Sequence, residues 1–133
     1  MTTHERPMHE KRAWGKYTVV HHLRNADGSE ALTKHLMLHA GGTISYQYHL
    51  HRREVWVIVS GQGLLVLDGA KQQVGPGTVV DIPIGAKHAL HACCALHFIE
   101  VQLGTPLIEE DIVRLARNWE DIQAYIAESH CSQ

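Results

Sequence analysis

The sequence has no strong excess of charge, no long apolar run and little cysteine. Its 12 Lys and Arg nearly balance 14 Asp and Glu, which leaves a formal net charge of −2 at pH 7. Such a balance does not favour general electrostatic binding to nucleic acid or to acidic membranes. No apolar run approaches the roughly 20 residues of a membrane-spanning helix. We therefore expect neither nucleic acid nor membrane as a partner.

Cysteine is too scarce to hold the fold together. There are three cysteines, two of them adjacent at positions 93 and 94. Three thiols do not make a disulfide framework, and adjacent cysteines bridge only with strain. We expect Cys93 and Cys94 to be buried structural thiols within HACCALHF. The polar N-terminal stretch MTTHERPMHEKRAWG has no signal-peptide core, so we expect a reducing, cytoplasmic location.

Histidine is the abundant residue, since its 12 copies equal Lys and Arg combined. It is the commonest metal ligand and the side chain that titrates near neutrality. Most of these histidines lie in polar ends or ordinary strand-like segments. His49, His51 and His88 differ because of the residues around them.

The middle of the chain predicts strand after strand. Short apolar segments are separated by Gly-rich turns, among them Asp27-Gly28, Asp68-Gly69 and Gly75-Pro76-Gly77. No long helical pattern interrupts the region from about residue 12 to 104. This spacing favours an all-β protein, a jelly-roll barrel or double-stranded β-helix. At 133 residues the chain is expected to be one domain, 1–133.

The pattern changes after Gly104. The segment TPLIEEDIVRLARNWEDIQAYIAE has apolar residues at helical spacing, which predicts a helical segment over about 106–128. Thr105 could cap it with Pro106 at the first position, and Asn118 could divide it in two. We expect it to cover one face of the sheet, the alternative being that it also closes the mouth of a pocket.

The stretch YHLHRREVWVIVSG carries candidate metal ligands. Alternate residues of a strand share a face, so His49 and His51 are expected to point the same way, together with Gln47. Glu54 can join them if Arg52-Arg53 forms a turn or bulge, and Gln47 is the reserve ligand if Glu54 points away. His88 follows a turn punctuated by proline and glycine. Three histidines and a carboxylate would suit Zn²⁺, Mn²⁺, Fe²⁺ or Ni²⁺.

These residues resemble the two motifs of the cupin superfamily. The first motif is matched by Gly42, His49, His51, Glu54 and Gly61. The second is matched by Gly77, Pro83, Gly85 and His88. The resemblance is closer still to the C-terminal cupin of type II mannose-6-phosphate isomerases, which are usually fused to a mannose-1-phosphate guanylyltransferase. It covers about residues 12–121, through AWGKYTVV, YQYHLHRREVWVIVSG and IEVQLGTPLIEEDIVRLARNWED.

The resemblance implies a metal held by His49, His51, Glu54 and His88, and isomerisation between an aldose and a ketose phosphate through a metal-stabilised enediol. Lys34 and Arg114 match the family as phosphate ligands, so Glu54, Lys34 and Arg114 are the expected catalytic set. The proton-transferring base is open among His35, His91 and pocket carboxylates. The sequence departs from the family at Leu50, Val55, Ala92 and the ending VRLARNWED, where VRLED is usual.

Two other functions fit the same residues. One is a different metal-dependent enzyme, such as an Fe²⁺ oxygenase, and the other is a non-catalytic sugar-binding or small-molecule-binding domain. Oxygen uptake would indicate the first, and ligand binding without turnover the second. Because short antiparallel sandwiches leave edge strands that commonly pair, we expect a homodimer.

Overall fold

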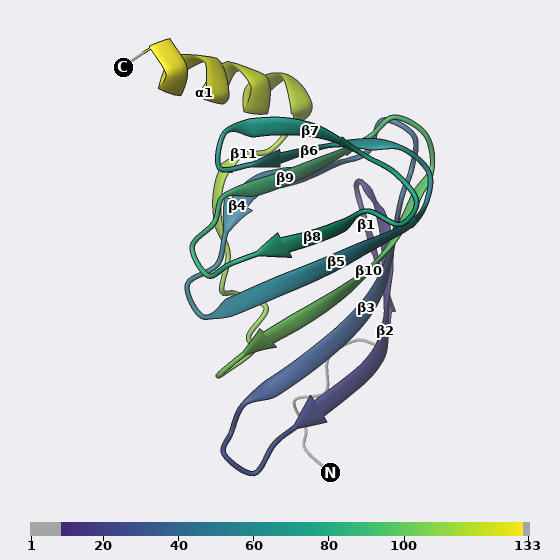
Figure 1. Cartoon of the computed structure of the whole chain (residues 1–133), viewed down its shortest axis with the longest axis vertical. Helices are drawn as coiled ribbons and strands as arrows, with labels where there is room; N and C mark the ends of the chain where they lie inside the picture. Colours follow the sequence, from purple (N-terminus) through teal and green to yellow (C-terminus); the bar gives the residue numbers. More distant parts are fainter. Residues whose placement is uncertain (1–8, 132–133) are drawn as a thin grey trace.

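The computed structural model describes residues 9–131 and contains two antiparallel sheets and one helix (Figure 1). The larger sheet has the strand order β1-β2-β3-β10-β5-β8, and the smaller one β11-β4-β9-β6-β7. The elements, in chain order, are β1 (His9–Arg12), β2 (Gly15–Arg24), β3 (Glu30–Leu38), β4 (Thr43–Tyr48), β5 (Arg52–Ser60), β6 (Gly63–Leu67), β7 (Ala70–Val74), β8 (Val79–Ile82), β9 (His88–Ala92), β10 (Leu96–Gly104), β11 (Val113–Ala116) and α1 (Trp119–Cys131). The predicted jelly roll is confirmed.

The strands form because their apolar residues alternate. In β3, every second residue from Glu30 to Leu38 is buried, which gives the strand an inner and an outer face. The expected hairpin at Asp27-Gly28 is present, since β2 pairs with β3 antiparallel. The main core lies between the two sheets and includes Trp56 and Phe98, whose rings are 4.7 Å apart. This core supports the strands that carry the site.

The C-terminal segment is not one helix. It divides at Asn118, where the carbonyl of the side chain accepts a hydrogen bond from the Asp121 N–H at 2.9 Å, capping the N-terminus of α1. The residues before Asn118 form β11 instead, because that segment pairs with β4. The expected helix start at Thr105 and Pro106 is therefore wrong.

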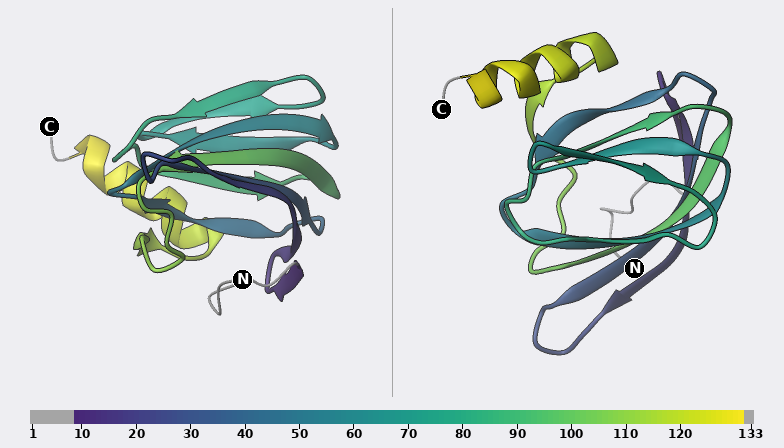
Figure 2. Two further views of the ribbon diagram at one scale, coloured as in Figure 1. Left: turned by 90° about the horizontal axis from the view of Figure 1, so that it is seen from below. Right: turned by 45° about the horizontal axis from the view of Figure 1, so that its top comes forward.

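Helix α1 covers the outer face of the smaller sheet, as Figure 2 also shows. Ile122 and Ile126 are buried there against Tyr46, Val66 and Ala89. The predicted role of the helix as a cover is thus confirmed. Within residues 9–131, no helix is long and apolar enough to span a bilayer.

The adjacent cysteines are not core residues. Cys93 and Cys94 are both exposed, with free thiols, in the connection between β9 and β10. The expectation of burial was wrong because the apolar pattern on either side belongs to two different strands. These thiols lie in the turn that separates the strands.

Candidate metal centre

Three of the four predicted ligands come together in the interior of the protein. His49, Glu54 and His88 each offer one ligand atom, and these atoms all lie within 4.8 Å of one another. The three residues are no more than 2% exposed. His49 follows β4, Glu54 is on β5 and His88 begins β9, so the two sheets contribute jointly. Buried groups of this kind require a partner or an ion.

The hydrogen bonds of the two imidazoles leave their lone pairs facing the carboxylate. His49 Nδ1 lies 2.6 Å from the carbonyl oxygen of Asp111, and His88 Nδ1 lies 3.0 Å from that of Ala86. A carbonyl only accepts, so Nδ1 carries the proton in each ring and Nε2 of the neutral ring has a lone pair. This arrangement is the usual second contact of a metal-binding histidine.

The Nε2 atoms of both rings approach the carboxylate of Glu54. His49 Nε2 is 3.1 Å from Glu54 Oε2, and His88 Nε2 is 3.9 Å from Glu54 Oε1. A proton on His49 Nε2 would satisfy the first contact. His88 Nε2 is buried and has no hydrogen-bond partner among residues 9–131. A divalent cation at the centre of the three would satisfy all of these atoms at once, so the residues fit a metal.

Glu54 is held in its ionised form. Burial raises its pKa, but the hydrogen bond to His49 and the nearby His88 and Arg52 side chains outweigh burial, and the net pKa lies well below the usual value. Trp56 Nε1 donates to Oε1 at 2.9 Å, and Arg52 Nε donates to Oε2 at the same distance. Burial also lowers the pKa of His88, so its imidazole stays neutral and able to bind a metal.

His51 is not part of this cluster. It is exposed, whereas His49 is buried, because β4 ends at Tyr48 and the chain bends through 50 and 51. The rule that alternate residues share a face applies only within a strand. The structure therefore separates His51 from His49, Glu54 and His88.

The bend between β4 and β5 also occurs earlier in the chain than the predicted turn at Arg52-Arg53. Arg52 and Arg53 do not form the predicted turn, because they already belong to β5. Arg52 is only 5% exposed and shares the inner face with Glu54 and Trp56. Its guanidinium also lies 3.5 Å from the Ile108 carbonyl and 3.4 Å from His49 Nε2. The alternation Arg52-Glu54-Trp56 was the signal in the sequence that could have located this residue.

Two distant segments fix the bend that carries His49. The carboxylate of Asp111 accepts hydrogen bonds from the N–H groups of Leu50 and His51 at 2.8 and 2.9 Å. Gly85 donates its N–H to the His49 carbonyl at 2.9 Å and has a φ of 84°, which glycine adopts easily. The turn before His88 is thereby tied to His49. Asp111 lies in the ending EEDIVR that resembles the family, but that resemblance assigned it no role.

Glu54 lines a cavity of about 410 Å³. Its lining comes from both sheets and from the segment after β10. The lining residues are Arg12, Ala13, Trp14, Tyr17, Lys34, Leu36, Thr43, Ile44, Ser45, Gln47, Arg52, Glu54, Trp56, Glu100, Gln102, Glu109, Ile112, Arg114 and Arg117. The predicted residues Lys34, Arg114 and Gln47 all line it. A small polar molecule would thus reach Glu54 through a charged passage.

The candidates for proton transfer differ in whether they line this cavity. His35 pairs with His97, and His91 stacks on Trp119 at 4.7 Å between ring centroids; neither His35 nor His91 lines the cavity. The carboxyls of Glu100 and Glu109 do. Burial and the negative charge of Glu54 raise the pKa of Glu100 to about 8.

Comparison with known proteins identifies the family. The protein-family model for the mannose-6-phosphate isomerase C-terminal domain matches residues 2–117. The chain belongs to this family. Two curated relatives are a mannose-1-phosphate guanylyltransferase of Escherichia coli K12, 35% identical over 85% of this chain and 23% of that protein, and the alginate biosynthesis protein AlgA of Pseudomonas aeruginosa, 34% identical over 88% of this chain and 23% of that protein. The chain therefore spans less than a quarter of either relative.

Solved structures show that this family member has the cupin fold. A variant of oxalate decarboxylase from Bacillus subtilis has a TM-score of 0.68 at 16% identity, over 80% of this chain and 30% of that one. A cupin-superfamily sugar phosphate isomerase from Silicibacter pomeroyi has a TM-score of 0.53 at 21% identity, over 60% of this chain and 62% of that one. At these identities the likeness establishes the fold alone.

Proposed function

We propose that this cupin is a metal-dependent isomerase that interconverts an aldose phosphate and a ketose phosphate, with mannose 6-phosphate and fructose 6-phosphate as the first pair to test. The observation that carries the proposal is the position of the cluster formed by His49, Glu54 and His88. One member of this cluster, Glu54, lines a cavity whose lining has more cationic than acidic side chains. Such a cavity suits a small anionic substrate.

His49, Glu54 and His88 would hold a divalent ion such as Zn²⁺, Mn²⁺, Fe²⁺ or Ni²⁺. When bound, the metal supplies Lewis acidity that polarises a carbonyl. Gln47 is the fourth protein group that we assign to the site in place of His51. It lines the cavity, pairs in register with His88 and accepts a hydrogen bond from Ser45 Oγ at 2.6 Å through its side-chain oxygen.

The protein must also move a proton between two adjacent carbons of the sugar. We assign this step to a carboxyl group of the cavity, Glu100 or Glu109, in preference to His35 and His91. Glu100 accepts a hydrogen bond from Gln102 Nε2 at 2.7 Å, which fixes the position of its carboxyl group. Trp14 and Tyr17 line the same cavity and would exclude water from one side of the sugar.

The test is a coupled assay of mannose 6-phosphate conversion. The full chain would be stripped of metal and reconstituted separately with Zn²⁺, Mn²⁺, Fe²⁺, Co²⁺ and Ni²⁺. We expect turnover with at least one ion and its loss in Glu54→Gln. Tight metal binding with no turnover for any ion would exclude this activity, and oxygen uptake would instead indicate an oxygenase.

We also propose that the protein is a homodimer. The outer face of β5 and β8 exposes Val57, Val59 and Val79, at 39%, 54% and 63%, and β8 is an edge strand. Apolar side chains next to a strand edge are commonly covered by a second copy. Light scattering would measure the mass in solution, and Val59→Asp would shift a dimer to monomer.

A further inference from the structure

One buried amide in the lining of the cavity has an oxygen without a partner. Gln102 on β10 is 1% exposed, and its Nε2 donates a hydrogen bond to Glu100 Oε1 at 2.7 Å. Its Oε1 is also buried and accepts no hydrogen bond from any group within residues 9–131. An unpaired amide oxygen in a protein interior costs free energy, so such atoms are normally satisfied by protein, water or ligand. Gln102 therefore needs a donor that this part of the chain does not supply.

The position of Gln102 indicates from which side that donor can come. Gln102 pairs in register with Leu32 of β3 and with Glu54 of β5, so its side chain lies between theirs on the inner face of the larger sheet. Leu32 is apolar, and an ionised Glu54 only accepts hydrogen bonds. Gln102 and Glu54 both line the cavity of about 410 Å³. Because the terminal torsion of glutamine is soft, a small rotation can present Oε1 to a molecule in this cavity.

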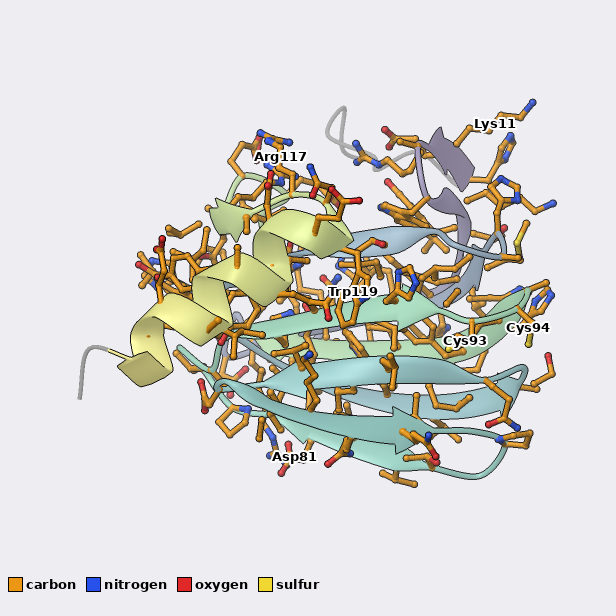
Figure 3. The ribbon with its side chains drawn as sticks, turned by 90° about the horizontal axis from the view of Figure 1, so that it is seen from above. Lys11, Asp81, Cys93, Cys94, Arg117 and Trp119 are labelled. Atoms are coloured by element: carbon orange, nitrogen blue, oxygen red, sulfur yellow. The ribbon has the colours of Figure 1, made fainter. Side chains whose placement is uncertain are left out.

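The cavity reaches solvent on the side of the molecule where α1 begins. Arg117 lines the cavity and is exposed. Figure 3 shows this residue where the chain enters the helix, on the opposite side of the molecule from Asp81. We therefore expect a ligand to enter from the side of Arg117.

The chemistry of Oε1 restricts which group of a ligand can satisfy it. As an acceptor, Oε1 needs an O–H or N–H group. A fully ionised phosphate or carboxylate cannot supply one, and the excess of cationic side chains in the lining disfavours an ammonium group. A hydroxyl group is a neutral donor, and a sugar carries several of them.

We propose that Gln102 Oε1 accepts a hydrogen bond from a sugar hydroxyl, and that Gln102 thereby selects ligands with a hydroxyl group beside the reacting carbons. The inference rests on the proposed function for the class of ligand. The uncharged end of the sugar then lies at Glu54 and Gln102, and its phosphate points away from them. Because Nε2 of the same amide holds Glu100, the bound hydroxyl also helps to position one of the two carboxyls to which we assign the proton transfer.

The experiment is a calorimetric titration of the full chain, first metal-free and then loaded with Zn²⁺. The probes are mannose 6-phosphate and its analogues without the hydroxyl group at C2, at C3 or at C4. We expect the C2 or the C3 analogue to bind the unaltered protein about tenfold more weakly than mannose 6-phosphate does. Gln102→Met removes both polar atoms at nearly the same side-chain length and should weaken mannose 6-phosphate by a similar factor. In that variant the same analogue should bind as well as mannose 6-phosphate, because the contact is already lost.

Gln73→Met is the matched control, because Gln73 is exposed on β7 and does not line the cavity. It should leave the affinity for all four probes unchanged. If Gln102 were only structural, Gln102→Met would weaken all four probes by the same factor, and the inference would be overturned. Equal binding of all four probes by the unaltered protein would also overturn it, since a metal-bound water could then satisfy Oε1. So would the absence of mannose 6-phosphate binding with and without Zn²⁺.

The proposed function is tested separately by the isomerase assay. Analogue-selective binding that depends on Gln102, with no isomerisation under any metal, would remove the isomerase and keep the hydroxyl site. Isomerisation with an unchanged KM in Gln102→Met would keep the isomerase and remove the hydroxyl site.

Discussion

Two histidine pairs in this molecule have the same spacing and different surroundings. The ring centroids of His49 and His88 are 5.1 Å apart, and so are those of His35 and His97. In the outer pair, His35 Nε2 and His97 Nδ1 are 2.9 Å apart, so one ring donates and the other accepts. In the inner pair, each ring donates to a backbone carbonyl and directs Nε2 toward Glu54. The outer pair uses up one lone pair in its own hydrogen bond, whereas His88 Nε2 of the inner pair has no hydrogen-bond partner within residues 9–131.

Distance between imidazoles is therefore not what distinguishes the candidate metal site here. What distinguishes it is a backbone acceptor behind each ring and a buried carboxylate in front of both. The outer pair is half-buried on the outer face of the larger sheet, and among residues 9–131 no carboxylate forms a three-residue ligand group with it. Each of the following experiments alters one member of this comparison.

The largest effect should follow loss of an inner ring. His88→Ala removes one of three ligands, and we expect the affinity for the preferred divalent ion to fall by more than about a hundredfold. Competition with a chelator of known affinity would measure this loss. An unchanged affinity would mean that the metal, if any, binds elsewhere.

Loss of the support behind the inner pair should have a smaller effect. Asp111→Ala removes the acceptor of the Leu50 and His51 N–H groups, so we expect metal affinity to fall about tenfold and the free energy of unfolding by about 1–3 kcal/mol. Urea denaturation would measure the stability. Asp81→Ala is the control, since it breaks only an exposed ion pair with Arg53 and should cost less than about 1 kcal/mol.

The third prediction concerns pH. Burial lowers the pKa of His88 below its usual 6.5, so the folded protein favours the neutral ring. The stability that this contributes is present above pH 6.5 and is lost as the pH falls below that value, because the unfolded chain then binds more protons. Metal-free protein should unfold more easily at pH 5.5 than at pH 7.5, and bound metal should weaken this dependence. Equal stability at the two pH values in the metal-free protein would contradict the assignment.

The smallest effect should follow changes in the outer pair. His35→Ala and His97→Ala should change the metal affinity less than about twofold, because neither ring belongs to the ligand cluster. The same chelator competition applies. A loss comparable to that of His88→Ala would show that the outer pair binds the ion and would reverse the comparison.

The sequence was sufficient for the fold and for three members of the site. Alternation and turns predict the strands, and the spacing of His49, Glu54 and His88 carries the family motifs. The errors occur where alternation stops. The chain bends at Leu50 and His51, so His51 does not share a face with His49. Strand β5 begins directly after His51, and its first residue, Arg52, points into the interior. The role of Asp111 could not be predicted, although it lies in the ending that resembles the family, because an acidic residue in a loop supports the bend only when the fold places it there.

The dependence of His49 on Asp111 has a consequence for the order in which the protein is made. The acceptor for His49 Nδ1 lies 62 residues downstream, and Arg52 contacts a carbonyl 56 residues downstream. During synthesis all three ligands leave the ribosome before these partners do. While the chain is being made, the side chain of His49 therefore lacks the contact that orients it. We expect a selective metal site to form only after the segment that follows β10 has left the ribosome.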